Sequence, residues 1–191
     1  KYLGERIDIH CGGIDHIPVH HTNEIAQSEA AVGHQWVNYW LHGEFLVTDG
    51  SKMSKSGGDF LKLTRLEEEG FAPMDFRFLC LQSRYRKQLL FSFETLKDAQ
   101  TAFRKLKARV QALAENALSK DPVRPDILDG YKNRFAGQIG DDLNTPNAIT
   151  VLLDVLKDGD LSNKEKLLLA EDFDRVLSLG LLSPDEKDAA P

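Results

Sequence analysis

Two lysines set among small polar residues offer the clearest chemistry in the sequence. The segment reads Lys52-Met53-Ser54-Lys55-Ser56, between the turn signal Thr48-Asp49-Gly50 and a pair of glycines. Ammonium groups on such a loop can offset the charge that develops on a departing pyrophosphate, and the serine hydroxyls can donate hydrogen bonds. The neighbouring glycines allow the loop to move. The segment predicts a loop that closes over a polyphosphate; the alternative is an exposed loop with no role.

A glycine turn near the start of the chain offers a second kind of chemistry. The β-prone run Ile7-Asp8-Ile9 leads to Gly12-Gly13-Ile14-Asp15, and a helical pattern follows. A strand, a glycine turn and a helix are typical of a nucleotide-binding α/β fold, in which a carboxylate can reach a ribose hydroxyl. The pattern therefore predicts that Asp15 faces a nucleotide.

A histidine and a glutamate in the predicted helix have the spacing of a metal-binding pair. His20 and Glu24 are four residues apart, so their side chains share one helix face and can both bind one metal ion. The same spacing also suits a simple surface interaction. The spacing alone leaves both interpretations open.

These segments resemble the cysteine-specific family of class I aminoacyl-tRNA synthetases. The 52–56 segment resembles the signature loop of the class, and Tyr39-Trp40-Leu41-His42-Gly43 resembles the strand and turn that precede this loop and contact adenine. The glycine turn followed by His20-His21-Thr22-Asn23-Glu24-Ile25-Ala26-Gln27 is similar to the cysteine-specific family. So is Asp141-Asp142-Leu143-Asn144-Thr145-Pro146-Asn147-Ala148, which resembles its Asp-Asp-Phe-Asn-Thr-Pro-x-Ala motif. The resemblance covers essentially the whole chain.

The resemblance implies an ATP-dependent ligase. ATP, with Mg²⁺, would convert cysteine to cysteinyl-adenylate, and the cysteinyl group would pass to tRNA(Cys). Lys52 and Lys55 would be catalytic, while His20 and Glu24 would supply two of four ligands to a zinc ion that holds the substrate thiolate. The other two ligands, both cysteines, and a His-x-Gly-His motif would precede Lys1, so we expect a C-terminal portion that is inactive alone. The implied ATP-binding residues are His10, Gly12, Gly13, Asp15, His42, Gly43, Lys52, Met53, Ser54, Lys55 and Ser56.

Two other functions stay open at this point. A ligase that joins cysteine to an amino-sugar in thiol biosynthesis would share the adenylation and the zinc but would need no tRNA. A non-catalytic, tRNA-binding fragment would keep the fold without the upstream motifs. The run from His20 to Gln27 and the Asn144-Thr145-Pro146 motif favour the synthetase.

The elements that must position these residues follow two patterns. The first part predicts strands at 7–9 and 43–47, a helix over 20–31 that ends at Gly33, and a strand-capable or helical run over 36–41. From about residue 61 the periodicity is helical, with helices over 89–114, 148–156 and 163–179. The fold class is α/β followed by all-α: the second half of a Rossmann-like catalytic domain (1–47), a signature-loop connector (48–88) and a helical tRNA-binding bundle (89–191).

Two local patterns within the helical part are specific. The apolar face of the 89–114 helix consists of Leu96, Ala99, Phe103, Leu106 and Val110. The motif Asn144-Thr145-Pro146 predicts the start of a helix, with Thr145 as the cap and Pro146 at the first helical position. We therefore expect that motif to be architectural.

Composition limits the partners and the compartment. The 191 residues carry a formal net charge of −6 and only two cysteines, so no disulfide framework forms and a reducing, cytoplasmic setting is favoured. No apolar run is long enough to span a membrane. A basic cluster nevertheless suits either the tRNA backbone or a solvated helix face: Arg84, Arg86, Lys87, Lys97, Arg104, Lys105, Lys107 and Arg109.

Overall fold

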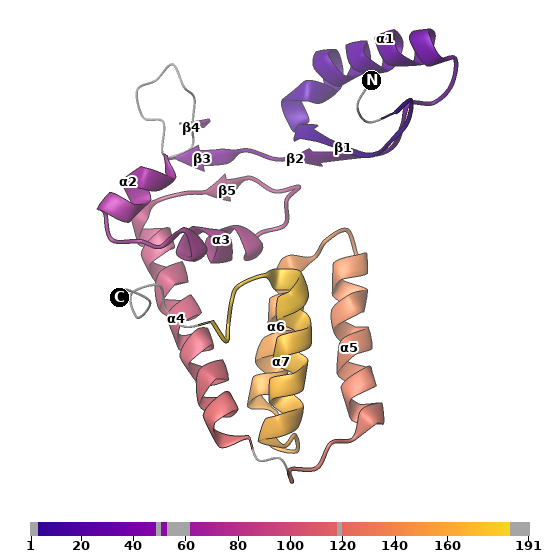
Figure 1. The fold of residues 1–191 in the computed structure, drawn as a ribbon. Coiled ribbons are helices and arrows are strands. Elements are labelled where there is room, and N and C mark those ends of the chain that lie inside the picture. The colour runs from indigo at the N-terminus through magenta and orange to yellow at the C-terminus, as the bar shows by residue number, and fades with distance from the viewer. Residues whose placement is uncertain (1–3, 49–50, 53–61, 118–119, 184–191) are drawn as a thin grey trace. The chain divides into compact units, whose positions relative to one another are not determined.

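The chain forms two compact units in a computed structural model that describes residues 4–48, 51–52, 62–117 and 120–183. Unit 1 comprises Lys1–Phe60 and Tyr85–Phe91, and unit 2 comprises Leu61–Arg84 and Ser92–Pro191. The chain thus leaves unit 1, returns to it for one short segment and ends in unit 2 (Figure 1). The three functional regions expected from the sequence stay a prediction.

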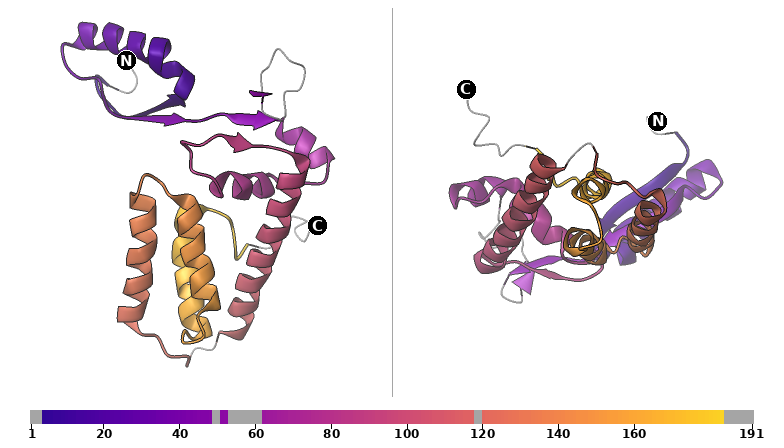
Figure 2. Two further views of the ribbon diagram at one scale, coloured as in Figure 1. Left: turned by 180° about the vertical axis from the view of Figure 1, so that it is seen from behind. Right: turned by 90° about the horizontal axis from the view of Figure 1, so that it is seen from below.

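A parallel strand pair with a covering helix opens unit 1. The strands are β1 (Ile7–Gly13) and β2 (Val37–Gly43). They are joined by a 3₁₀ turn (Ile14–His16), a π turn (Ile17–His21) and helix α1 (Thr22–Val32). Parallel strands need a crossover of this kind, and Figures 1 and 2 show α1 running along the strand pair.

A second, small sheet completes the described part of unit 1. Strand β3 (Leu46–Thr48) pairs antiparallel with β4 (Ser51–Lys52) and parallel with β5 (Leu89–Leu90). The amides of Leu89 and Phe91 donate to the carbonyls of Phe45 and Val47, at 3.0 and 2.8 Å. Sequence-distant segments therefore meet in this sheet.

The elements of unit 1 differ in detail from the sequence expectations. Strand β1 continues beyond residues 7–9 through the glycines, and the 36–41 run is a strand. The helix begins at Thr22 instead of His20, because the π turn that contains Pro18 precedes it. Gly33 ends the helix as predicted, with a left-handed φ of 76°.

Helices are the only regular secondary structure among the described residues of unit 2. Two short helices, α2 (Leu63–Glu68) and α3 (Pro73–Leu81), precede the return to unit 1. The longer helices then follow in the order α4 (Phe93–Asn116), α5 (Pro125–Gly140), α6 (Thr145–Lys157) and α7 (Asn163–Leu177). None of the described helices is long and apolar enough to cross a membrane.

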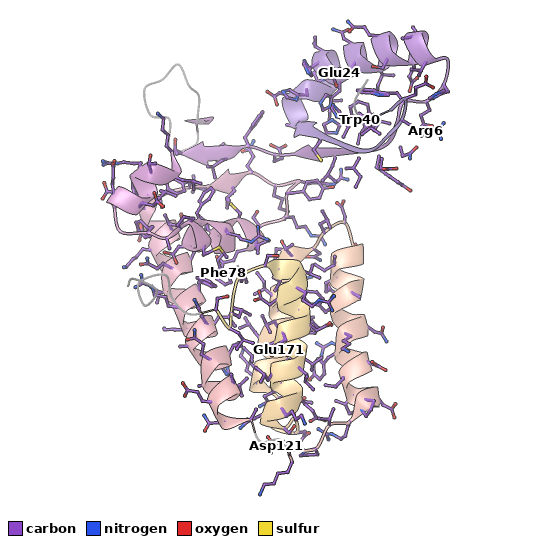
Figure 3. All side chains as sticks on the ribbon, in the orientation of Figure 1. Arg6, Glu24, Trp40, Phe78, Asp121 and Glu171 are labelled. Atoms are coloured by element: carbon purple, nitrogen blue, oxygen red, sulfur yellow. The ribbon has the colours of Figure 1, made fainter. Side chains whose placement is uncertain are left out.

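The predicted apolar face of α4 is buried in the core of unit 2. Phe78 of α3 stacks on Phe103 of α4, with ring centroids 5.4 Å apart, and Figure 3 shows Phe78 beside that helix. Phe135 of α5 stacks on the fully buried Phe173 of α7 at 4.1 Å. Aromatic pairs of this kind add to the stabilisation that burial already gives.

Three helix starts depart from the predictions. Helix α4 begins at Phe93 instead of residue 89, because Ser92 caps it by accepting a hydrogen bond from the Thr95 amide. Helix α5 was not predicted, and its several glycines weaken a helical pattern. At α6 the predicted cap is wrong: Asn144, not Thr145, accepts the hydrogen bond from the first turn, and Pro146 is the second helical residue.

Candidate functional site

The carboxyl ends of β1 and β2 bring together residues that the resemblance assigns to ATP. In the paired strands Gly12 lies beside His42, and Gly13 lies beside Gly43. His10 precedes the two glycines on β1. In open α/β sheets, ligands bind beyond the carboxyl ends of parallel strands. These residues therefore share the edge at which a nucleotide would be expected.

Close packing explains why glycines end β1. A Cβ atom on Gly12 would lie 2.4 Å from Cε1 of His21 and 2.7 Å from Nδ1 of His16. A Cβ atom on Gly13 would lie 2.4 Å from Oδ1 of Asp15. The glycines thus let an imidazole and a carboxylate approach the strand, and Asp15 lies against its end.

Glu24 is held between two histidines. Nε2 of His10 donates to Oε2 of Glu24 at 2.8 Å, and Nε2 of His20 lies 3.1 Å from Oε1. Burial works to raise the pKa of Glu24, but the hydrogen bond from His10 and the charges of the neighbouring histidines outweigh it, so the pKa lies below its ordinary value. The carboxylate therefore stays ionised, as a metal ligand or ion-pair partner must.

His21 is the buried member of this cluster. Its side chain is 4% exposed, and its Nδ1 forms a hydrogen bond of 2.7 Å with Nε2 of His42. Burial, reinforced by the positive charge of His10, lowers the pKa of His21. The imidazole is thus neutral at ordinary pH, the form in which histidine binds metals.

The donor atoms offer two metal-binding sets that share Glu24. The predicted set is His20, in the π turn, with Glu24, in the first turn of α1, and the His20 side chain is 63% exposed. The second set is His10, His21 and Glu24, whose ligand atoms all lie within 4.8 Å of one another. Imidazole and carboxylate donors fit zinc, so the chemistry of either set suits that ion.

Sequence reasoning singled out neither of the two tryptophans of this site. The rings of Trp36 and Trp40 lie 5.5 and 4.9 Å from that of His10, and Trp40 also stacks parallel to His42. Figure 3 shows Trp40 and Glu24 between α1 and the strands. Strand alternation was the available signal, because it places Trp40 and His42 on one face.

Most of the predicted signature loop lies outside the described residues. Lys52 ends β4, where it pairs with Val47 of β3. Met53, Ser54, Lys55 and Ser56 are not described. Their predicted roles therefore stay predictions.

The basic cluster divides between the two units and between two kinds of environment. Arg84 forms an ion pair with Asp141, and Arg109 donates to the carbonyl of Leu156. By contrast, Arg104 and Lys105 lie exposed in the middle of α4. The exposed members retain the capacity to contact phosphates.

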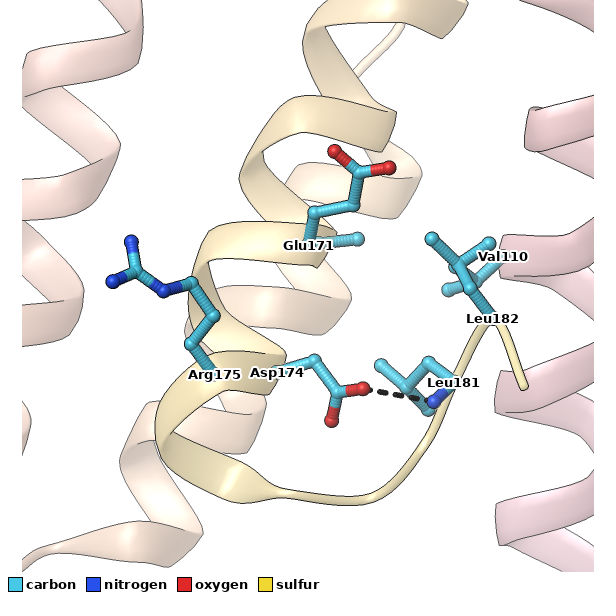
Figure 4. Close-up of a pocket in the computed structure, with 7 residues that line it drawn as sticks. Val110, Glu171, Asp174, Arg175, Leu181 and Leu182 are labelled. Carbon is cyan, nitrogen blue, oxygen red and sulfur yellow. Dashed lines mark hydrogen bonds between the residues drawn. The ribbon is translucent and has the colours of Figure 1, made fainter.

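A pocket in unit 2 contains none of the predicted site residues. It has a volume of about 240 Å³ and is lined by α4, α7 and the segment that follows α7 (Figure 4). The carboxylate of Asp174 accepts hydrogen bonds from the amides of Leu179 and Leu181, at 2.7 and 2.8 Å. Asp174 therefore has a structural role in ending α7.

Comparison with solved structures supports the fold. The chain is similar to a leucyl-tRNA synthetase from Agrobacterium radiobacter K84, solved as a ternary complex with tRNA and LeuAMS. The TM-score is 0.64 at 15% identity, covering 94% of this chain and 28% of that one. At this identity the likeness shows the fold alone, and it confirms the predicted class of α/β followed by helices.

Sequence relatives are more specific. The cysteine–tRNA ligase of Treponema denticola is 43% identical over 200 residues, which cover 95% of this chain and 41% of the relative. Cysteine–tRNA ligase 1 of Burkholderia lata is 44% identical over 182 residues, covering 95% and 37%. The chain thus spans about two fifths of the length of these relatives.

The family assignment rests on the segment that carries the site. The profile described as "tRNA synthetases class I (C) catalytic domain" matches residues 1–101, which include β1, α1, β2 and the 52–56 segment. The chain therefore belongs to the class I (C) tRNA synthetase catalytic-domain family.

Proposed function

We propose that the protein to which this chain belongs is a cysteine–tRNA ligase. The observation that supports this most directly is the gathering of Glu24, its flanking histidines and the glycine turn at the carboxyl ends of β1 and β2. A carboxylate and imidazoles suited to zinc thus lie beside the edge where a nucleotide would bind. Relatives that bear the name cysteine–tRNA ligase match across nearly the whole chain.

The first step joins cysteine to AMP. A carboxylate oxygen of cysteine attacks the α-phosphorus of ATP, the bond from that phosphorus to the bridging oxygen breaks, and pyrophosphate leaves. Lys52 and Lys55 stabilise the charge that develops on the pyrophosphate, and Met53, Ser54 and Ser56 complete the loop. His10, Asp15 and His42, with the glycines at the strand ends, line the nucleotide site.

His20 and Glu24 supply the selectivity for cysteine. Zinc, when bound there, would coordinate the substrate thiolate, which a zinc site prefers to a serine hydroxyl. The π turn that carries His20 and the first turn of α1, which carries Glu24, bring Nε2 of His20 to 3.1 Å from Oε1 of Glu24, and His10 holds the second carboxylate oxygen at 2.8 Å. The chain's own contribution is thus a pre-oriented half of the site.

The second step transfers the cysteinyl group to the terminal ribose of tRNA(Cys). The ribose hydroxyl attacks the carbonyl carbon of the adenylate, and AMP leaves. The basic cluster of residues 84–109 supplies phosphate contacts along the tRNA. Arg104 and Lys105, which are exposed in the middle of α4, are the members best placed to make such contacts.

Cysteine-dependent exchange between ATP and pyrophosphate, measured on the complete gene product, tests this proposal. We expect exchange that requires cysteine, is absent with serine and falls by about a hundredfold or more in Lys55→Ala, because that lysine would act mainly in the transition state. Charging of tRNA in the same preparation separates the synthetase from a cysteine:amino-sugar ligase. A folded, zinc-loaded protein without exchange would show that the scaffold serves binding alone.

A further inference from the structure

The two oxygens of the Glu24 carboxylate have different partners. Oε1 lies 3.1 Å from Nε2 of His20, and Oε2 accepts a hydrogen bond of 2.8 Å from Nε2 of His10. The His20 side chain is 63% exposed, whereas the His10 side chain is 27% exposed. One oxygen therefore lies beside an open imidazole, and the other is engaged by an imidazole that the fold encloses.

Strand register places His10 where it can reach Glu24. His10 pairs with Trp40 in the ladder of β1 and β2, and paired residues of neighbouring strands project to the same side of a sheet. That side is the one along which α1 runs, because His10 contacts Glu24 of this helix. Figure 3 shows Trp40 and Glu24 together between α1 and the strands. The hydrogen bond thus joins a strand to a helix within unit 1.

Three rings hold the His10 imidazole in this orientation. The Trp40 ring is perpendicular to it at 4.9 Å between centroids, and the rings of Trp36 and His21 lie 5.5 and 4.8 Å away. Trp36 is itself tied to α1, because its amide donates to Oε1 of Glu29 at 3.2 Å. Packing against these rings restricts rotation of the imidazole, so its Nε2 stays directed at the carboxylate.

A carboxylate with one oxygen already engaged binds a metal ion through the other. Carboxylates can bind through one oxygen or through both, and Ca²⁺ often takes both. Structural zinc sites are almost always four-coordinate, and carboxylates that bind zinc are themselves held by hydrogen bonds from groups behind them. Because His10 engages Oε2, Oε1 is the oxygen left for a metal ion shared with His20.

We propose that His10 is a positioning residue for the metal site and holds Oε2 of Glu24 so that this carboxylate binds zinc through Oε1 alone. A Glu24 that binds through one oxygen leaves free a coordination position that a second oxygen would fill, and the substrate thiolate can take it. This role differs from the contact with ATP that the family resemblance implies for His10. The inference deepens the proposed function and rests on it for the identity of the metal and the substrate.

Cobalt substitution in the complete gene product reports the number of metal ligands, because the visible absorption of bound Co²⁺ weakens as that number rises. In His10→Phe, which keeps a ring against Trp40 but has no donor, we expect Oε2 to join the metal and the visible bands to weaken. In His10→Gln, whose side-chain amide can donate to Oε2, we expect the parent spectrum to return. Identical spectra in the parent and His10→Phe overturn the proposal. If His10→Phe does not fold, His10→Leu takes its place in the comparison with His10→Gln.

Zinc affinity, measured by competition with a chromophoric chelator, separates positioning from ligation. His10→Phe should bind zinc about tenfold more weakly than the parent, and His10→Gln within about threefold of it, because only the former loses the hydrogen bond to the ligand. His16→Phe is the matched control, because the His16 ring packs 5.0 Å from that of His20, and its affinity should stay within about threefold of the parent. If His10 were itself a ligand, glutamine would restore neither affinity nor spectrum, and the proposal would fall.

Kinetics separate this role from a contact with ATP. In cysteine-dependent pyrophosphate exchange, His10→Phe should raise KM for cysteine about tenfold and leave KM for ATP within about twofold of the parent. A rise confined to KM for ATP counts against the proposal, and so does a parent that binds no zinc. A parent that binds zinc but shows no exchange would defeat the proposed function, while the spectra and the zinc affinities would still decide the role of His10.

Discussion

Two carboxylates, Glu24 in unit 1 and Glu165 in unit 2, show how differently the two regions use an acid. Glu165 is fully buried and accepts hydrogen bonds from the Arg124 guanidinium, at 2.8 and 2.9 Å, and from the amides of Arg124 and Ser162. Glu24 is 29% exposed and is held by His10 and His20. One acid is surrounded by an arginine and backbone amides, the other by imidazoles of a kind that can bind metals.

The pKa values follow this difference. The hydrogen bond from Arg124 lowers the pKa of Glu165 to about 2, against the opposing effect of burial. The pKa of Glu24 is also lowered, against burial, by the hydrogen bond from His10 and the charges of the neighbouring histidines. A carboxylate whose oxygens all accept hydrogen bonds from an arginine and backbone amides has a structural role. A carboxylate held by imidazoles, which can also bind metals, is suited to a functional site.

Removal of the Glu165 side chain should have the largest effect. We expect Glu165→Ala to lower the free energy of unfolding by about 3 kcal/mol, because the start of α5 and the cap of α7 lose their shared acceptor. Chemical denaturation measures the change. Glu171 is an exposed acid on α7, the helix that also carries Glu165, and Glu171→Ala should cost less than about 0.5 kcal/mol. A similar loss in both variants would show that Glu165 has no special structural role.

A second test distinguishes the two candidate sets of metal ligands in unit 1. In the complete gene product, His20→Ala should weaken zinc binding about a hundredfold, and His21→Ala less than about tenfold, because His21 already bonds to His42. Competition with a chromophoric chelator measures both affinities. A larger loss in His21→Ala would instead assign the metal to His10, His21 and Glu24.

The smallest effect concerns acid stability. A carboxyl whose pKa is lower in the folded state than in the unfolded chain stabilises the fold above its unfolded pKa, and this contribution is lost as the pH falls through the folded value. Between pH of about 4.5 and about 2, the parent should therefore lose more unfolding free energy than Glu165→Gln. If the unfolding free energies of the two proteins fall in parallel as the pH is lowered, protonation of Glu165 does not contribute to the loss of stability in acid.

Local patterns were enough to predict much of this molecule. Gly33 ends α1, and the apolar positions of α4 from Leu96 to Val110 are buried, because helix ends and helix faces follow from neighbours along the chain. His20 and Glu24 also meet, as their spacing of four residues suggested, although His20 lies in the π turn and not in the predicted helix. Family resemblance, not spacing, supplied the chemistry assigned to these residues.

The remaining features depend on residues far apart in the sequence. Leu89 and Leu90 continue a helical pattern, but pairing with β3 makes them a strand. The contact between His21 and His42 likewise requires the register of β1 against β2. Asn144 caps α6 in place of Thr145 because the hydroxyl of Thr145 is used on α3. No local pattern contains these partners.

The interleaving of the two units has a consequence for synthesis on the ribosome. Strand β3 leaves the exit tunnel with one parallel edge lacking its partner until β5 has been translated, and α2 and α3 must be made in between. An unpaired strand edge is a site of mispairing and aggregation while it waits. No single break in the polypeptide can release either unit whole, and unit 1 cannot be completed before the first part of unit 2, Leu61–Arg84, has been made.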